Sequence, residues 1–241
     1  MPLTLIRIDP DPILSARWFA AENLLPRTQD DGGYAWHAIL SAAFGRERAP
    51  KPFRILARRG RDPQVLAYAE TEAAVLQRAA EDFADPVAFA ALRLGEKSVI
   101  GKPMPRFAPG RRLGFSVRAR PTVRIDRDGD RRKSAEIDAY VAALRAAPAE
   151  PTDRKAVYAR WTRDKLEAGG AKVHELRFDG LEQVKVVRRD AAGRPRPVKG
   201  HSAEFIGVLD VTDPDAFASL LARGVGRHRS FGYGMLLLSP A

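Results

Sequence analysis

The sequence predicts an α+β protein made of two similar halves, each an antiparallel sheet with helices packed on one face. Three observations lead to this fold class. Strand-like apolar segments are interleaved with stripes of helical spacing, and the order of elements before residue 121 is repeated in outline after it. In addition, 45% of the 241 residues are hydrophobic, which is enough for a buried core, yet no apolar run approaches the roughly 20 residues that span a bilayer.

The first half is predicted to contain four strands and two helices. Strands are expected at residues 3–8, 53–59, 65–70 and 113–119, and helices at 34–44 and 84–94. The first helix is indicated by an apolar stripe at spacings of three and four residues, formed by Trp36, Ile39, Leu40, Ala43 and Phe44. The strand at 113–119 alternates between an apolar and a basic face, and the basic face includes Arg118 and, just beyond the strand, Arg120.

A charged stretch, residues 126–133, is expected to be a solvated linker or turn, so we divide the chain into residues 1–122 and 123–241. Ser134 is expected to cap a helix whose apolar stripe is Ile137, Tyr140, Val141 and Leu144.

The last third is predicted to be rich in strands. A helix at about 153–168 should end at the Gly169-Gly170 pair, and strands at 181–189 and 197–211 should form a hairpin around residues 190–193. Asp213 should cap a further helix with Pro214 in its first position, and a strand at 235–238 closes the chain.

The charge indicates a polyanionic partner. Lys and Arg number 41 against 30 Asp and Glu, a net charge of +11. Nucleic acid is the commonest partner of such a surface and an anionic membrane the second, while a genome that favours arginine codons would explain the charge without any partner.

The composition argues against several kinds of chemistry. The absence of cysteine removes disulfides, thiolate metal sites and cysteine nucleophiles, and the four histidines lack metal-ligand spacing, so we expect neither a metal nor a cofactor. The segment Met1 to Pro10 lacks the apolar core of a signal peptide, and we expect a soluble cytoplasmic protein that does not bind membranes.

One candidate for chemistry is the pair Tyr34 and His37. Residues three apart on a helix are neighbours, and a histidine exchanges protons near neutral pH while an adjacent phenol can orient a reacting hydroxyl. From the spacing alone, a half-buried histidine satisfied by backbone groups is the simpler explanation.

A second candidate is the glycine-rich loop from Gly224 to Gly234, which contains Arg227, His228 and Arg229. Glycine lets the backbone approach a ligand closely, and successive N–H groups can then face phosphate oxygens. The loop lacks the order of strand and helix of the dinucleotide fingerprint, and it lacks the Gly-Lys-Ser/Thr ending of a Walker A loop. An ordinary surface turn explains it equally well.

The predicted hairpin is basic on both arms, with Lys185, Arg188 and Arg189 on one and Arg194, Arg196 and Lys199 on the other. A two-stranded ribbon of this kind can bind nucleic-acid phosphates, although a solvated edge hairpin is an equal alternative.

Together these segments resemble CasE, the family of repeat-processing endoribonucleases of type I-E CRISPR systems. The resemblance rests on four stretches: GGYAWHAILSAAFG (32–45), RRLGFSVRARPTVR (111–124), AVYARWTRDKLEAGGAKV (156–173) and LARGVGRHRSFGYGMLLLSP (221–240).

The resemblance implies two tandem ferredoxin-like (RRM-like) domains. It also implies an endoribonuclease that binds the stem-loop of the CRISPR repeat and cuts pre-crRNA at the 3′ base of the stem. The RNA's 2′-OH attacks the adjacent phosphate without a metal, which leaves a 2′,3′-cyclic phosphate and a 5′-OH. The enzyme then stays on its product as a subunit of the surveillance complex (Cascade).

Site residues follow from the same resemblance. The family's catalytic histidine and tyrosine correspond to His37 and Tyr34, and a basic loop residue, commonly lysine, corresponds to Arg229. We expect RNA contacts from the loop, the hairpin and the basic strand face, at Gly226, Arg227, His228, Ser230, Lys185, Arg188, Arg189, Arg194, Arg196, Arg118 and Arg120.

The chain departs from the family in three places. Arg120 stands directly before Pro121, where the family has an asparagine; Arg229 replaces the common lysine; and Ser41 and Ala42 stand where some members have a lysine.

Two other functions remain as alternatives. One is a non-catalytic RNA-binding subunit of the same architecture, which would bind repeat RNA without cutting it. The other is a basic protein of ribosome assembly, which would explain the charge but not the Tyr-His pair or the loop.

Overall fold

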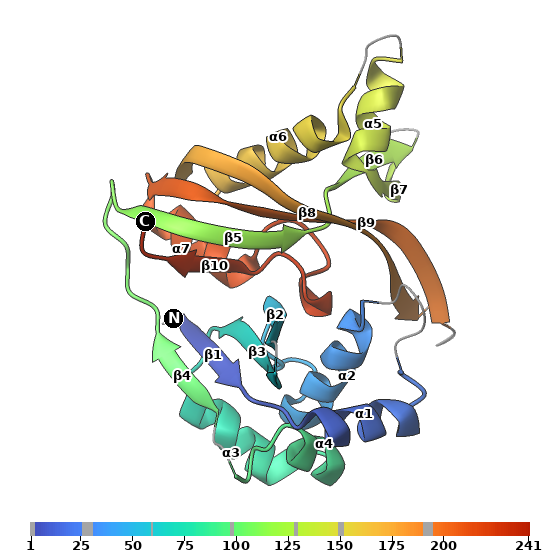
Figure 1. The fold of residues 1–241 in the computed structure, drawn as a ribbon, viewed down its shortest axis with the longest axis vertical. Coiled ribbons are helices and arrows are strands. Elements are labelled where there is room, and N and C mark those ends of the chain that lie inside the picture. The colour runs from blue at the N-terminus through green and yellow to red at the C-terminus, as the bar shows by residue number, and fades with distance from the viewer. Residues whose placement is uncertain are drawn as a thin grey trace.

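The structure, a computed structural model, describes residues 3–25, 31–58, 60–96, 99–127, 130–148, 152–189 and 195–241. The first sheet has the strand order β2-β3-β1-β4 and is antiparallel throughout. Its strands are β1 (Thr4–Ile8), β2 (Phe53–Arg58), β3 (Arg61–Ala69) and β4 (Ile100–Pro103). The helices α1 (Pro12–Ala21), α2 (Gly33–Phe44), α3 (Ala73–Phe83) and α4 (Pro86–Ala91) lie together against this sheet (Figure 1).

The second sheet has the strand order β10-β5-β9-β8 and is also antiparallel. Its strands are β5 (Arg112–Ala119), β8 (Ala171–Arg189), β9 (Pro195–Val211) and β10 (Leu236–Ser239), and its main helices are α6 (Arg154–Glu167) and α7 (Pro214–Arg223). In each sheet the last strand lies beside the first and the second strand is at the edge. This is the ferredoxin-like order, so the predicted tandem ferredoxin-like fold is confirmed.

Most elements expected from the sequence are present. The strands at 3–8, 53–59, 65–70 and 113–119 and the helices at 34–44, 153–168 and after Asp213 match β1, β2, β3, β5, α2, α6 and α7. Helices α1 and α3 were not predicted, and β8 begins at Ala171, well before the expected residue 181. The expected turn at 190–193 lies outside the described residues.

The segment expected to be a charged linker forms a small two-stranded sheet instead. Strands β6 (Thr122–Arg127) and β7 (Asp130–Asp138) pair antiparallel, while residues 128–129 lie outside the described part. Val123 is opposite Ile137 and Ile125 opposite Ala135, and such apolar cross-strand pairs stabilise a ribbon despite its charge.

The helix that follows this ribbon begins later than predicted. Helix α5 covers Ala139–Ala146, and its cap is Asp138, whose side chain accepts a hydrogen bond from the Tyr140 amide at 2.8 Å. Ser134 lies inside β7, and the cap of α5 is Asp138, so the prediction of a cap at Ser134 was wrong.

The pairing of β5 corrects the expected division at residue 122. β5 lies between β10 and β9, and its apolar residues Phe115 and Val117 are buried in the core of the second sheet. The two sheets therefore divide the chain between β4 and β5, because β5 finds its partners among the last strands of the chain.

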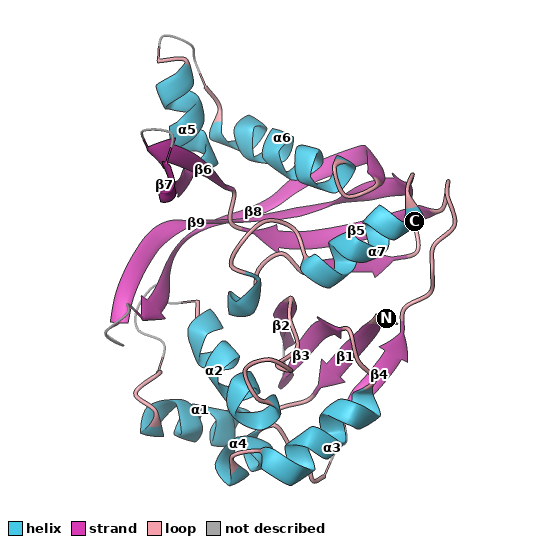
Figure 2. Cartoon of the chain, turned by 180° about the vertical axis from the view of Figure 1, so that it is seen from behind, coloured by secondary structure: helices cyan, strands magenta, loops and turns pink. Residues whose placement is uncertain are grey.

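The two halves are joined by specific contacts. The hydroxyl of Tyr68 on β3 donates to the carbonyl of Leu236 on β10 at 2.9 Å. Arg54 on β2 donates to the Ser116 hydroxyl at 2.7 Å and pairs with Glu204 at 2.9 Å. Figure 2 shows the same junction from behind. The long strands β8 and β9 extend beyond the ends of β5 and β10 toward α1 and α2. In the part of the chain that the structure describes, no helix is both long and apolar enough to cross a membrane.

Candidate active site

Tyr34 and His37 lie in the first half of α2, and both side chains are half-buried. The helix begins after Gly32, which has a φ of 67°, and the Asp31 carboxylate accepts a hydrogen bond from the Gly33 amide at 2.9 Å. Asp31 therefore satisfies one of the free N–H groups at the start of the helix.

The glycine-rich loop packs directly on this helix. Its short 3-10 turn η1 (Arg229–Phe231) stacks the ring of Phe231 on that of Tyr34, with an angle of 25° between the planes and centroids 6.1 Å apart. The same ring is edge-on to that of His37 at 5.6 Å. A Cβ on Gly33 would lie 2.2 Å from the carbonyl oxygen of Phe231, so only glycine allows this approach. The structure thus brings together the two segments that the sequence singled out.

A second contact ties the loop to the start of α2. The hydroxyl of Tyr233 donates to the Asp31 carboxylate, although the two residues are 202 positions apart. Burial, followed by the nearby charge of Asp31, raises the pKa of Tyr233, so the phenol stays protonated and remains a donor. Asp31 thereby links the loop to the helix that carries His37.

Glycines and one histidine adopt the turns that the loop requires. Gly226 has a φ of 76°, and a Cβ there would lie 2.5 Å from the Trp161 ring. His228 also has a positive φ, 63°, which is uncommon for a residue with a side chain. The loop is therefore a defined structure packed on the second core, which explains its glycines without reference to a ligand.

His228 does not face outward as expected for an RNA contact. Its side chain is fully buried, and its Nε2 lies 2.5 Å from the Glu136 carboxylate on β7. Arg227 pairs with the same carboxylate at 2.8 Å but remains partly exposed, as does Ser230. The buried His228 is therefore not placed to contact RNA, whereas RNA contacts by Arg227 and Ser230 stay predictions.

Arg229 is exposed, but its guanidinium donates to the carbonyl of Arg223 at the end of α7. The cations that act on His37 are Lys51 and Arg46, from the segment between α2 and β2. Burial is the main cause that lowers the pKa of His37, and the charges of Lys51 and then Arg46 lower it further. Sequence analysis missed both residues, because nothing in the spacing shows that this segment folds back beside the helix.

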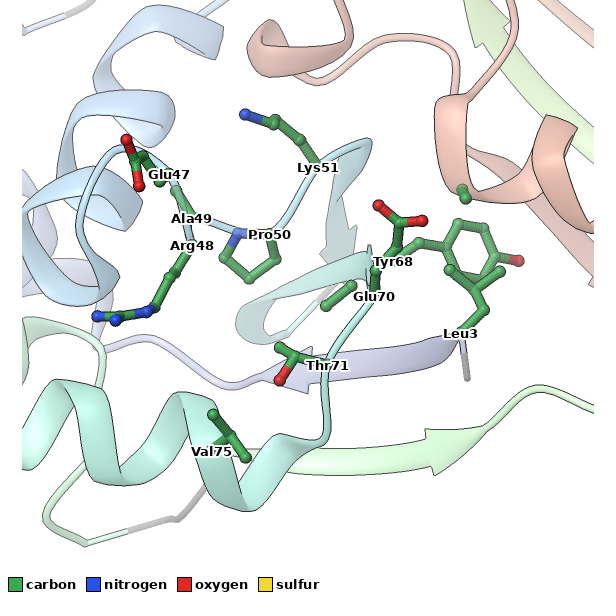
Figure 3. A pocket seen from close by; sticks show the side chains of 12 residues that line it. Leu3, Glu47, Arg48, Ala49, Pro50, Lys51, Tyr68, Glu70, Thr71 and Val75 are labelled. Carbon is green, nitrogen blue, oxygen red and sulfur yellow. The ribbon is translucent and has the colours of Figure 1, made fainter. Parts of the chain in front are cut away.

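Lys51 also stands at the rim of a pocket with a volume of about 370 Å³ between the two halves. Its walls include Leu3, just before β1, Tyr68 from β3 and Ala222 from α7. Figure 3 shows the Lys51 side chain extending from this rim toward the space between the pale blue ribbon that carries α2 and the pale red C-terminal segment. Lys51 thus lines this pocket, and its charge also acts on His37.

The basic hairpin formed by β8 and β9 leaves the second sheet beside the glycine-rich loop. Val184 on β8 is buried against Tyr233, with Phe231 packed on both, so the next residue, Lys185, stands close to the loop. The register places Lys185 opposite Lys199 and Arg188 opposite Arg196. The like charges of Lys185 and Lys199 repel, and an anionic ligand would relieve that repulsion. Arg188, Arg189 and Arg196 are described only as backbone within the strands, and Arg194 lies outside the described residues.

Arg118 on β5 and Arg120 just after it were both expected to contact RNA, but their surroundings differ. Arg118 is partly exposed and pairs with Ser202 at 2.9 Å and Glu182 at 3.0 Å, with its guanidinium over the Tyr233 ring. Arg120 is buried, and a Cβ on Gly200 would lie 2.0 Å from its Nη2. Arg120 is therefore a packing residue in this structure and not the RNA contact that we expected.

No group of three or more His, Asp or Glu side chains suited to a metal ion occurs among the described residues. The side chains of the candidate site can instead offer three kinds of chemistry: proton transfer by His37, hydrogen bonding by Tyr34, and charge neutralisation by Lys51 and Arg46.

The fold and the site together define a class of protein with two tandem ferredoxin-like domains. A Tyr-His pair on the first domain packs against the glycine-rich loop of the second, next to a basic hairpin. The sequence profile of the family described as "CRISPR associated protein" matches residues 3–240, and the chain belongs to this family. The resemblance seen in the sequence is thereby confirmed.

Comparisons with individual proteins agree. The chain is 30% identical over 145 residues to the CRISPR-associated endoribonuclease Cse3 of Thermus thermophilus, an alignment that covers 56% of this chain and 59% of that relative. The structure of Thermus thermophilus Cse3 bound to an RNA representing a pre-cleavage complex is 24% identical, with a TM-score of 0.66 and complete coverage of both chains. The CRISPR-associated protein Cas6e from Escherichia coli K-12 is 18% identical, with a TM-score of 0.53 and complete coverage of both chains. At these identities the two structures establish a shared fold.

Proposed function

We propose that this protein is a metal-independent endoribonuclease that binds the stem-loop of a CRISPR repeat and cuts pre-crRNA at the 3′ base of the stem. The observation that carries the proposal is the packing of Phe231 against both Tyr34 and His37, at the point where the basic hairpin leaves the second sheet. The naming of the relative Cse3 as a CRISPR-associated endoribonuclease supports the same reaction. After cleavage the protein stays on its product as a subunit of the RNA-guided surveillance complex, in line with the fold match to a chain of such a complex.

The reaction is an internal transesterification. The 2′ oxygen forms a bond to phosphorus while the bond from phosphorus to the 5′ oxygen breaks, which leaves a 2′,3′-cyclic phosphate and a 5′-OH. His37 takes the proton of the 2′-OH, and water returns a proton to the leaving 5′ oxygen. Because burial and two cations lower the pKa of His37, its ring is neutral near pH 7 and can act as the base.

Tyr34 orients the 2′-OH by a hydrogen bond, because its phenol can both donate and accept. Lys51 and Arg46, whose charges already act on His37, stabilise the extra negative charge on the phosphorane. They replace Arg229 in that role, because the Arg229 guanidinium is directed to the Arg223 carbonyl.

Binding depends on charge. Lys185 and Lys199 on the hairpin and Arg227 on the loop contact phosphates of the stem, and each phosphate contact adds to the salt dependence of affinity. The scissile step then lies over α2.

The test is cleavage of a repeat hairpin by the His37→Ala variant in the presence of EDTA. We expect wild-type protein to yield a product with a cyclic-phosphate end, to lose activity on RNA with a 2′-deoxy nucleotide at the scissile step, and to need no metal. His37→Ala should bind RNA but not cut it. His174→Ala is the matched control, because His174 lies on β8, where its Nε2 is 2.7 Å from the Asp210 carboxylate at the surface, and its loss should leave the rate unchanged. Cleavage by His37→Ala at the wild-type rate would refute the assignment, and wild-type protein that binds without cutting would favour the non-catalytic RNA-binding subunit.

A further inference from the structure

Glu136 on β7 holds two residues of the glycine-rich loop at once. Its Oε1 lies 2.5 Å from His228 Nε2, and its Oε2 lies 2.8 Å from Arg227 Nε. The His228 side chain is fully buried and that of Glu136 is 17% exposed, so water competes little for the contact with His228, whereas the Arg227 side chain is 43% exposed. The hydrogen bond between His228 and this carboxylate is stronger than one between neutral groups, and Arg227 adds an ion pair to the other oxygen.

The backbone of His228 needs such an anchor. Its φ of 63° lies in the left-handed region, where a residue with a side chain is disfavoured unless its surroundings hold it. The His228 carbonyl in turn accepts a hydrogen bond from the Phe231 amide at 2.8 Å, which closes the turn η1. The position of Phe231 is therefore set by the conformation of His228.

Phe231 transmits that position to the reacting side chains. Its ring is stacked on Tyr34 and edge-on to His37, and its carbonyl oxygen packs against Gly33. The rings of His228 and Phe231 are also near one another, with centroids 6.3 Å apart. One continuous series of contacts therefore runs from β7, which belongs to neither four-stranded sheet, to the Tyr-His pair.

We propose that Glu136 is a positioning residue for RNA cleavage, which acts by fixing His228 and through it the ring of Phe231 against Tyr34 and His37. The inference rests on the proposed function and assigns a role to the small β6–β7 sheet. Glu136 touches neither the RNA nor the reacting atoms. Its loss should lower the rate of the chemical step and leave RNA affinity largely intact.

Glu136→Gln tests this with little change in volume. The variant removes the carboxylate charge, which weakens the hydrogen bond to His228 and abolishes the ion pair with Arg227. We expect the single-turnover rate at saturating repeat RNA to fall by about 10- to 100-fold, the scale of a displacement near 1 Å, while the dissociation constant for RNA changes by less than about threefold. Glu167→Gln, at an exposed pair with Arg163 on α6, is the matched control and should leave both values unchanged.

NMR of protein labelled with ¹³C-histidine provides a readout without RNA. Phe231 lies edge-on to His37, so displacement of its ring should move the His37 signals in Glu136→Gln but not in Glu167→Gln. This measurement separates the two proposals, because wild-type protein that fails to cut RNA would overturn the proposed function whatever the His37 signals do.

If wild-type protein cuts, then Glu136→Gln with a wild-type rate would overturn the positioning role. Should Glu136→Gln fail to fold, Phe231→Leu replaces it, since that variant leaves the Glu136 contacts in place and removes only the ring. It should show the same selective loss of rate, and a wild-type rate for Phe231→Leu would equally overturn the inference.

Discussion

Replacing Gly33 by alanine is the sharpest test of the contact between the loop and α2. An added Cβ would lie 2.2 Å from the Phe231 carbonyl oxygen and 2.9 Å from its carbonyl carbon. Carbon and oxygen normally approach to about 3.3 Å, so loop and helix must separate by about 1 Å. The backbone of Gly33 does not have a positive φ, and the effect is therefore steric alone.

Two magnitudes follow from this separation. Overpacking of this kind costs about 1 to 3 kcal/mol, which for a chain of this size lowers the melting temperature by roughly 2 to 12 °C. Alanine would by itself favour the helix by up to about 1 kcal/mol, so any net loss of stability comes from the contact. Displacement of Tyr34 and His37 relative to bound RNA by about 1 Å should slow cleavage by about 100-fold.

The assays are thermal unfolding and single-turnover cleavage of repeat RNA. Gly180→Ala is the control, because its nearest neighbour would be the Glu204 Cβ at an ordinary 3.9 Å. If Gly33→Ala were to melt and cut like the wild type, close packing of the loop on α2 would not be a feature of the working enzyme.

Further predictions concern charge. Lys51→Met should raise the pKa of His37, yet leave it below the ordinary value of about 6.5, because burial is the larger cause. NMR titration of the histidines measures this pKa. An unchanged value would show that the charge of Lys51 does not act on His37. The same variant should cut about 10²- to 10³-fold more slowly at saturating RNA, and a wild-type rate would exclude Lys51 from charge stabilisation. Since the pKa of His37 is lowered, the wild-type rate should fall with decreasing pH only below about 6.5, whereas a fall that begins above pH 7 would contradict its role as a base. Hydrogen bonds from Arg112 and then His174 hold the pKa of Asp210 at about 2, so this carboxylate stabilises the fold above its unfolded pKa of about 3.9 and loses that effect as the pH falls toward 2. Asp210→Asn should therefore unfold more readily than the wild type at pH 7, with a difference that narrows below pH 4; a difference that widens in acid would show the opposite linkage.

Local patterns in the sequence were sufficient for most of the secondary structure. The strict alternation of β5, the stripe of α2 and the Asp213-Pro214 start of α7 each reflect a single element with one buried face. Residues 126–133 were misjudged because their charge suggested a linker, whereas pairing of β6 with β7 depends on the apolar residues that flank them. A pattern within one segment does not show which other segment will cover it.

The candidate site shows the same contrast between local sequence features and contacts between distant segments. Tyr34, His37 and the glycine-rich loop could be identified from residue types, spacing and the family resemblance, because those features are local. That His228 turns inward to Glu136, that Arg120 is buried and that Lys51 and Arg46 act on His37 depend on contacts between residues far apart in the chain. Of this protein, the sequence by itself determined the α+β elements, the basic character and the Tyr-His pair. The tertiary structure decided how the strands divide between two sheets and which charged side chains face the pair, since burial and pairing arise only when distant segments pack together.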